Sequence, residues 1–298
     1  PAAAGLGRAG GLAAAADTRP AGPPERLLLD VGQGDAILLR HGRRAVLVDG
    51  GGLPGDFDLA GRVLVPALAR HGVRRLDAVV MTHPDRDHCR GLVGLLGLLP
   101  VAEVWTGHGW GDDGCAGDLA AAAHDQIGRV VRLVRLEAGD RRSLGAWRFE
   151  VLYPRRREPL AREDNDRSLV LAARAHGHRV LLTGDVSTLV EARLAARHGE
   201  ALRADVLKVA HHGSRSSTGE RFLEAVLPRW ALVSAGATNP YGHPAPEVLE
   251  RLGRRRVRVL STHRHGLVRM AFPAEGSARA EAPYAPRPQP VHSPRGGR

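Results

Sequence analysis

The sequence predicts a mixed α/β fold in which two β-sheets pack face to face and helices cover their outer surfaces. Short apolar runs of strand length alternate with turns and amphipathic stretches through the body of the chain. Each half of that body opens with several strands and continues with mixed helices and strands. Two sheets covered by helices are the most economical packing for such a pattern.

The individual elements are bounded by glycines, prolines and polar turns. The first half has predicted strands at 26–30, 35–40, 45–48, 76–82 and 101–105, and predicted helices at 57–72 and 91–99. The second half has predicted strands at 147–154, 168–174, 178–185, 204–213, 229–236 and 255–263, and predicted helices at 187–199, 218–227 and 245–253.

Composition separates the body from its two ends. Residues 1–24 are rich in Ala, Gly and Pro and are predicted to be a disordered linker, whereas 274–298 form a Pro- and Arg-rich tail. Residues 25–273 are therefore predicted to be one folded domain. The start at Pro1 suggests a piece of a longer polypeptide, and no run of about 18 uncharged apolar residues predicts a membrane span.

The net charge of +11 favours a polyanionic partner, either nucleic acid or an anionic membrane surface. An arginine-biased composition is the alternative explanation, because Lys208 is the only lysine among the 43 basic residues. The two cysteines, Cys89 and Cys115, can form a disulfide or remain free thiols, so the redox compartment stays open.

Polar clusters follow the ends of several predicted strands. The segment HPDRDH at 83–88 follows LDAVVMT, Asp185 follows RVLLTG, and the histidine pair at 211–212 follows ADVLKVA. Strand ends in a mixed sheet meet at one edge, so these side chains can converge on a single site. Two divalent cations about 4 Å apart can activate a water and hold the attacking and leaving oxygens. A polar turn with Asp87 capping the next helix explains the first segment alone, but not the three clusters together.

Six motifs, in this order, resemble the carboxy-terminal domain of the ComEC family, the DNA-uptake channels of naturally transformable bacteria. They are DVGQGDAIL at 30–38, THPDRDH at 82–88, NDRSLVL at 165–171, LLTGD at 181–185, VLKVAHHGSRSS at 206–217 and NPYGHP at 239–244. The resemblance covers residues 26–271 and implies the αββα sandwich of the metallo-β-lactamase fold. It also implies a dinuclear metal site and a soluble domain attached to a membrane channel, on the extracytoplasmic face.

The resemblance assigns a role to each polar residue of these motifs. The expected metal ligands are His83 and Asp85 at the first cation, Asp87 and His88 at the second, Asp185 as a bridge, and His212, or alternatively His211, at the second cation. His243 is expected to face the substrate, as a general acid or as a phosphate contact. The expected catalytic residues are thus Asp87, Asp185 and His243.

This ligand set is richer in oxygen than that of most zinc hydrolases. Many members of the fold have a histidine where this chain has Asp85, and a further histidine before TGD, where Asn165 or Asp166 stands nearest here. Oxygen ligands shift the preference toward Mn²⁺ or Mg²⁺. We therefore expect two divalent cations, with Mn²⁺ favoured and Zn²⁺ or Mg²⁺ as alternatives.

Other polar residues of the motifs are expected to bind the phosphate or to support the ligands. The expected substrate contacts are Ser214, Arg215, Ser216, Asn239 and His243, although a simple polar loop explains the first three equally well. The residues expected to support the ligands are Asp30, Asp35, Asp49 and Asn165.

These features predict a metal-dependent DNA nuclease that acts in DNA uptake during natural transformation and degrades the strand that is not imported. The expected partners are DNA and the membrane-channel portion of the same polypeptide, and the domain is otherwise expected to be monomeric. With only 4% aromatic residues, DNA binding should depend on phosphate contacts and be salt-sensitive. The alternatives are a hydrolase of small or cell-wall-linked phosphoesters and a non-catalytic DNA-guiding module.

Overall fold

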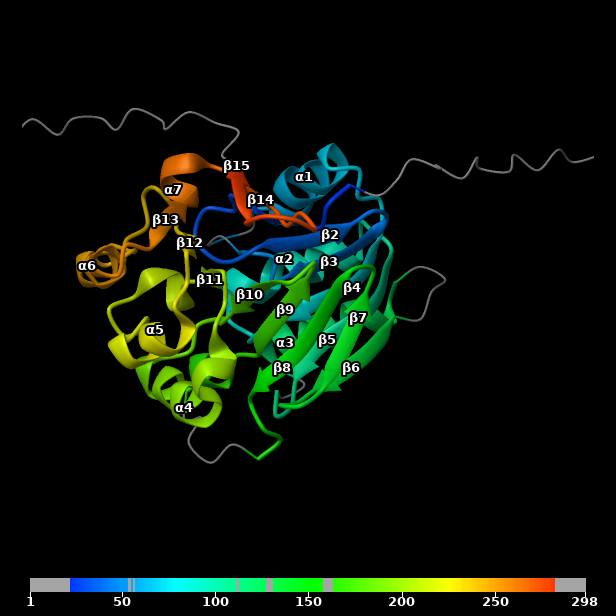
Figure 1. The fold of residues 1–298 in the computed structure, drawn as a ribbon. Coiled ribbons are helices and arrows are strands. Elements are labelled where there is room, and N and C mark those ends of the chain that lie inside the picture. Colours follow the sequence, from blue (N-terminus) through cyan, green and yellow to red (C-terminus); the bar gives the residue numbers. More distant parts are fainter. Residues whose placement is uncertain are drawn as a thin grey trace, which may run out of the picture.

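The computed structural model describes residues 22–281, except 53, 54, 56, 111, 112, 127–130 and 158–162. Two sheets pack face to face, and helices lie on their outer faces (Figure 1). The αββα sandwich expected from the sequence is therefore confirmed.

The first sheet has eight strands in the order β15-β14-β1-β2-β3-β4-β5-β6. These strands are β1 (Glu25–Leu28), β2 (Ile37–His41), β3 (Arg44–Val48), β4 (Leu76–Met81), β5 (Val101–Gly107), β6 (Arg132–Leu136), β14 (Val268–Ala271) and β15 (Arg279–Glu281). Strands β3 to β6 are parallel. Strand β4 is buried along its whole length, as expected for a central parallel strand that is covered on both faces.

The second sheet has seven strands in the order β13-β12-β11-β10-β9-β8-β7. These strands are β7 (Arg141–Leu144), β8 (Trp147–Tyr153), β9 (Val170–Ala175), β10 (His178–Leu182), β11 (Val206–Lys208), β12 (Trp230–Val233) and β13 (Arg258–Ser261). Strands β10 to β13 are parallel, so their carboxyl ends lie at the same edge of the sheet.

Helices cover both outer faces of the sandwich. The first sheet is covered by a π-helical segment (Ala60–Leu64), α1 (Val65–Arg70), α2 (Arg86–Leu96) and α3 (Gly114–His124). The second sheet is covered by α4 (Thr188–His198), α5 (Glu220–Val226) and α6 (Pro246–Arg254), and the short α7 (Thr262–His265) follows β13. Apolar side chains fill the space between each sheet and its helices and also the space between the two sheets, where Trp105 and Trp147 pack against Phe149.

Several elements differ from the sequence-based prediction. Helix α2 begins at Arg86, inside the 83–88 segment, and not at residue 91, so its first turn carries two of the predicted ligands. The prediction missed α3, whose Ala- and Gly-rich sequence has little amphipathic pattern, and β6 and β7, whose arginines face solvent. Strand β15 lies within the predicted tail at 274–298, and it pairs with β14 of the folded domain. Residues 1–21 and 282–298 of the predicted ends lie outside the described residues.

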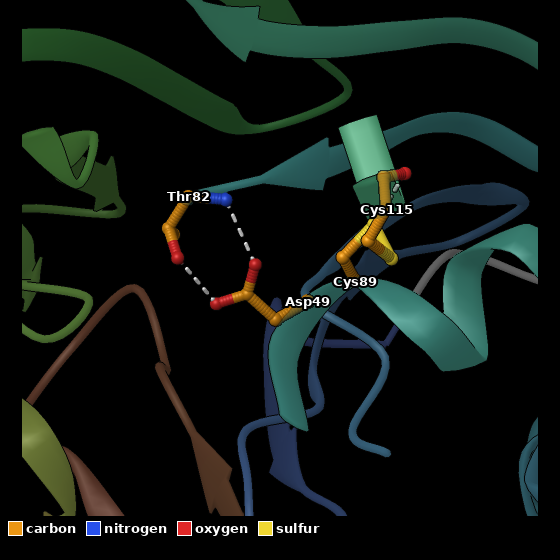
Figure 2. Close-up of a disulfide and its surroundings, with 4 residues drawn as sticks. All are labelled: Asp49, Thr82, Cys89 and Cys115. Carbon is orange, nitrogen blue, oxygen red and sulfur yellow. Dashed lines mark hydrogen bonds between the residues drawn. A yellow bond between two sulfur atoms is a disulfide. The ribbon is translucent and has the colours of Figure 1, made fainter. Parts of the chain in front are cut away.

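A disulfide joins Cys89 of α2 to Cys115 of α3 (Figure 2). Of the two possibilities that the sequence left open, the structure thus has the paired cysteines. The bond fixes the helix whose first turn carries predicted metal ligands. None of the helices in the described part of the chain combines the length and the apolar character that crossing a bilayer requires.

Candidate metal centre

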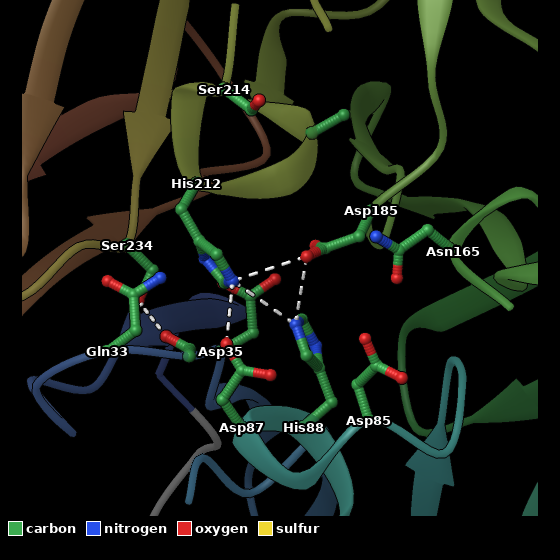
Figure 3. Close-up of polar contacts among 12 residues, drawn as sticks. Gln33, Asp35, Asp85, Asp87, His88, Asn165, Asp185, His212, Ser214 and Ser234 are labelled. Atoms are coloured by element: carbon green, nitrogen blue, oxygen red, sulfur yellow. Dashed lines mark hydrogen bonds and ion pairs between the residues drawn. The ribbon is translucent and has the colours of Figure 1, made fainter. Parts of the chain in front are cut away.

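The carboxyl ends of β4, β10 and β11 bring four predicted ligands together (Figure 3). Asp185 Oδ2 lies 3.2 Å from His88 Nε2 and 3.3 Å from His212 Nε2. His212 Nε2 is also 3.3 Å from Asp87 Oδ2 and 3.3 Å from His88 Nε2. Ligands of a tetrahedral cation with bonds of about 2.1 Å are separated by about 3.4 Å. These four side chains therefore fit the ligands of one divalent cation.

His83 and Asp85 lie beside this group. The ring of His83 is fully buried, with its centroid 4.1 Å from that of His88, and its Nε2 is 3.6 Å from Asp85 Oδ2. Two buried atoms, His83 Nε2 and Asp185 Oδ1, have no hydrogen-bond partner among the described residues. Because buried polar atoms are normally satisfied, these atoms fit a second cation that shares Asp185 with the first.

The buried carboxylate of Asp49 fixes the rings of two predicted ligands. Its Oδ2 accepts a hydrogen bond from His88 Nδ1 at 2.9 Å and from the Thr82 hydroxyl at 2.7 Å, as Figure 2 shows for Thr82. Since this hydroxyl donates to Asp49, it accepts from His83 Nδ1 at 3.0 Å. Both rings then carry their proton on Nδ1, which leaves the Nε2 lone pairs for a metal.

A buried ion pair lies behind His212. Asp35 Oδ1 is 3.5 Å from His212 Nδ1, on the side of the ring away from Asp185, and Asp35 Oδ2 is 2.5 Å from Lys208 Nζ. Ligand atoms of Asp35, His88, Asp185 and His212 all lie within 4.8 Å of one another, but the position of Asp35 behind the His212 ring makes it a support of that ring. Gly34 permits the arrangement, because at its φ of +107° a Cβ would come within 2.0 Å of the Asp87 carbonyl oxygen.

Charge is tightly balanced among these buried groups. Burial alone lowers the pKa of His88 and His212, but Asp185 and the other nearby carboxylates raise both pKa values well above the usual range. Burial likewise raises the pKa of Asp185, but the two histidines hold it well below its usual range. Cations at this site must displace the protons of the histidines, so metal affinity should rise with pH.

The two neighbouring histidines of the 211–212 pair have different surroundings. Only His212 contributes a nitrogen to the cluster, and His211, the alternative ligand, instead lies against His243 with ring centroids 5.8 Å apart. His243 faces the cluster at 6.5 Å from the His212 ring, and its Nδ1 is buried without a hydrogen-bond partner within the described residues. Burial and the charges of His212 and His211 lower the pKa of His243.

Four of the residues predicted to bind the substrate form contacts with other groups of the protein. Asn239 donates to the carbonyl oxygens of Gly236 and His243 at 2.7 and 2.8 Å and accepts from the His243 amide, so it braces the loop that carries His243. Arg215 pairs with the exposed Glu247 at 2.9 Å. Ser214 and Ser216 share a hydrogen bond of 3.0 Å near the surface.

Asp30 and Asn165, both predicted to support the metal ligands, lie at different distances from the site. Asp30 is exposed, accepts from the Gly32 amide at 3.3 Å and does not reach the metal ligands, because the turn after it brings Asp35 inward instead. The side chain of Asn165 lies beside Asp185 in Figure 3, and its buried Oδ1 has no hydrogen-bond partner in the described chain. Asn165 thus occupies the side of the site where a further ligand was expected.

Sequence reasoning missed three residues of this region. Thr82 and Lys208 stand directly in the quoted motifs, and a lone lysine inside an apolar strand is a signal of a buried ion pair. Glu191 of α4 is buried and accepts the amides of Thr218 and Gly219 at 2.7 Å each, which fixes the loop after the histidine pair. Its sequence context, an acidic residue on an amphipathic helix, gave no signal.

Curated relatives match most of this chain. ComE operon protein 3 of Bacillus subtilis is 33% identical over 258 residues, which cover 82% of this chain and 32% of that protein. Competence protein ComA of Neisseria gonorrhoeae is 31% identical over 274 residues, which cover 91% of this chain and 36% of that protein. The chain thus spans about a third of the length of the curated relatives it matches.

The fold and the family of the chain are consistent with these relatives. Among solved structures, CmlA, a diiron beta-hydroxylase from Streptomyces venezuelae, has a TM-score of 0.57 at 15% identity, over 85% of this chain and 55% of that chain. At this identity the likeness shows the fold alone. The sequence model of the Metallo-beta-lactamase superfamily matches residues 29–236. The chain therefore belongs to the metallo-beta-lactamase superfamily, and the two relatives described above are ComEC family proteins, as its motifs predicted.

Proposed function

We propose that this domain is a metal-dependent DNA nuclease that acts in DNA uptake and degrades the strand that is not imported. The observation that carries the proposal is the convergence of Asp87, His88, Asp185 and His212, with separations of 3.2 to 3.3 Å. Both relatives belong to the ComEC family and one is named a competence protein, which supports DNA as the substrate. The net charge of +11 is also suited to a polyanion.

The residues of the chain can perform distinct parts of phosphodiester hydrolysis. Two divalent cations in such a site supply activation of the attacking water and stabilisation of the charge on the phosphate. Asp185 contacts His88 and His212 through Oδ2, and its buried Oδ1, which has no hydrogen-bond partner in the described chain, would hold the other cation. Asp49 accepts a hydrogen bond from the His88 ring, and Asp35 forms an ion pair with the far side of the His212 ring. His243 faces the open side, where its ring can form a hydrogen bond to a phosphate oxygen.

The donor set supports Mn²⁺ as the cation. Three carboxylates, Asp85, Asp87 and Asp185, and the amide oxygen of Asn165 lie around the site with three imidazoles. Oxygen donors in this proportion suit Mn²⁺ or Mg²⁺ better than Zn²⁺. The proposal therefore includes a requirement for Mn²⁺, with Mg²⁺ and Zn²⁺ as weaker activators.

The disulfide supports a location on the extracytoplasmic side. Disulfides persist in oxidising compartments and are rare in the cytosol. The bond between Cys89 and Cys115 is therefore suited to a domain outside the cytoplasmic membrane. The membrane-channel partner and the monomeric state stay predictions.

The test is cleavage of end-labelled single- and double-stranded DNA in Mn²⁺, Mg²⁺, Zn²⁺ or EDTA. Asp185→Asn keeps the shape of the side chain but removes its charge, so we expect cleavage to fall by about a hundredfold or more. Arg197→Ala is the matched control, because this exposed residue of α4 lies away from the ligand cluster. DNA that stays intact with folded, metal-loaded protein would overturn the proposal, and turnover of bis(p-nitrophenyl) phosphate alone would indicate a small phosphodiester as substrate.

A further inference from the structure

A pocket lies at the same edge of the sandwich as the metal centre. It has a volume of 580 Å³ and is enclosed by residues of α1 and α7, both at the upper side of the molecule in Figure 1, and by the end of β1. Pockets of this size hold ligands as large as one nucleotide. None of the predicted metal ligands lines this pocket.

The lining of the pocket combines cationic, imidazole and apolar groups. Arg70 and Arg264 bring guanidinium groups, and His71, His263 and His265 bring imidazole rings. Arg264 is exposed and forms no ion pair with any residue that the structure describes, and His263 Nδ1 is buried without a hydrogen-bond partner there. Guanidinium groups suit a phosphate, and imidazole rings with the apolar wall suit a base. Asp30 is the one carboxylate among these lining residues.

The pocket and the metal centre are connected by the ends of neighbouring parallel strands. His212 follows β11, the pocket residues of α7 follow β13, and β12 lies between these two strands. Strands are about 4.8 Å apart, so the two sites are separated by roughly 10 Å. Successive phosphates of a single strand lie further apart than the axial rise of about 3.4 Å in a duplex, so this distance corresponds to roughly one or two nucleotides.

The loop after β12 spans the interval between the two sites. Ala237 of this loop lines the pocket, and His243 at its other end faces the metal ligands. Between them, Tyr241 is 68% exposed and stacks on His243, with ring centroids 5.6 Å apart and planes at 26°. An exposed aromatic ring at this place can stack on a base of a bound strand.

We propose that this pocket binds one nucleotide of a single-stranded DNA substrate, about one or two nucleotides from the phosphate at the metal centre. Arg264 contacts its phosphate, the histidines and the apolar wall contact its base, and Tyr241 stacks on a base between the two sites. The proposal rests on the proposed nuclease function, since it extends the substrate path of that same site.

The test is equilibrium binding of a nuclease-resistant phosphorothioate thymidine 12-mer and of the mononucleotide thymidine 5′-phosphorothioate, in Mn²⁺. We expect Arg264→Ala to weaken binding of the 12-mer by about tenfold and to reduce the salt dependence (log Kd against log salt) by about 0.7. Ala237→Trp, at an exposed turn position, should have a similar effect by filling the pocket. Binding of the mononucleotide, which is too short to span both sites and binds the metal centre through its phosphate, should not change in either variant. Arg197→Ala is the control and should bind both ligands as the wild type does.

Two results would overturn the pocket proposal. One is unchanged 12-mer affinity in both Arg264→Ala and Ala237→Trp, and the other is an equal loss for the 12-mer and the mononucleotide. Cleavage of an ordinary 12-mer by the wild type is measured in parallel. If the wild type leaves the ordinary 12-mer intact but binding still depends on the pocket residues, the nuclease function is overturned and the pocket remains a DNA-binding site.

Discussion

The carboxylate of Asp49 accepts a hydrogen bond from Nδ1 of His88 at 2.9 Å, and through Thr82 it also fixes His83. One buried side chain thus sets the orientation of two imidazoles that come from different ends of the 83–88 segment. Metal ligands that are held in this way need little reorganisation on binding, and the loss of such partners typically lowers metal affinity by about 10- to 100-fold.

Asp49→Asn should therefore weaken Mn²⁺ binding by about 10- to 100-fold. Thr82→Val should have a smaller effect, because it removes the partner of His83 and leaves that of His88. Isothermal titration calorimetry measures both affinities. Asp77→Asn is the control, since Asp77 is a buried carboxylate that pairs with Arg44 away from the ligands. A folded Asp49→Asn protein with wild-type affinity would contradict this account.

Lys208→Met should destabilise the fold by about 3–5 kcal/mol, because it leaves the carboxylate of Asp35 buried without its cation. Combining it with Asp35→Asn removes the unpaired charge, so the double variant should recover much of the lost free energy of unfolding. Urea unfolding of the two single variants and the double variant measures this coupling. Additive losses would show that the two side chains do not stabilise the fold as a pair.

Replacing both cysteines by alanine should lower the free energy of unfolding by about 2–4 kcal/mol. The disulfide closes a loop between positions 26 residues apart, and a crosslink of that span restricts the unfolded chain by about 3.5 kcal/mol in the chain-entropy description. Dithiothreitol should destabilise the wild type by a similar amount and leave the double variant unchanged. Equal unfolding midpoints of oxidised and reduced wild type would be inconsistent with this contribution.

The architecture and the ligand cluster were accessible from the sequence for a common physical reason. Apolar strands such as β4 and β10 are followed at once by their polar residues, and parallel strands bring such ends to one edge. The elements that were missed lack that contrast. The burial patterns of β6 and β7 are mostly exposed or half-exposed, so their sequences resemble charged loops.

Within the site, the sequence could not separate residues whose roles depend on which way a side chain points. His211 and His212 are adjacent and chemically identical, and only the left-handed turn at both positions decides that His212 enters the cluster. Asp30 and Asp35 both flank the glycine turn, yet only Asp35 faces inward. Such distinctions depend on backbone angles and on contacts between distant segments.

Glu25→Gln should destabilise the protein by about 1–2 kcal/mol at pH 7, and the difference should vanish in acid. Glu25 of β1 is buried, which by itself raises its pKa, but its contacts with Arg269 at 2.9 Å and Arg40 at 3.2 Å lower the pKa overall. A carboxylate whose pKa is lower in the folded state contributes stability above its unfolded value of about 4.5, and the contribution disappears as pH falls through the folded value. Urea unfolding at pH 7, 5 and 3.5 measures the difference, with the exposed, unpaired Glu200→Gln as control within the described residues. A gap between wild type and variant that widens on acidification would refute the assignment, because protonated Glu25 has no charge to lose.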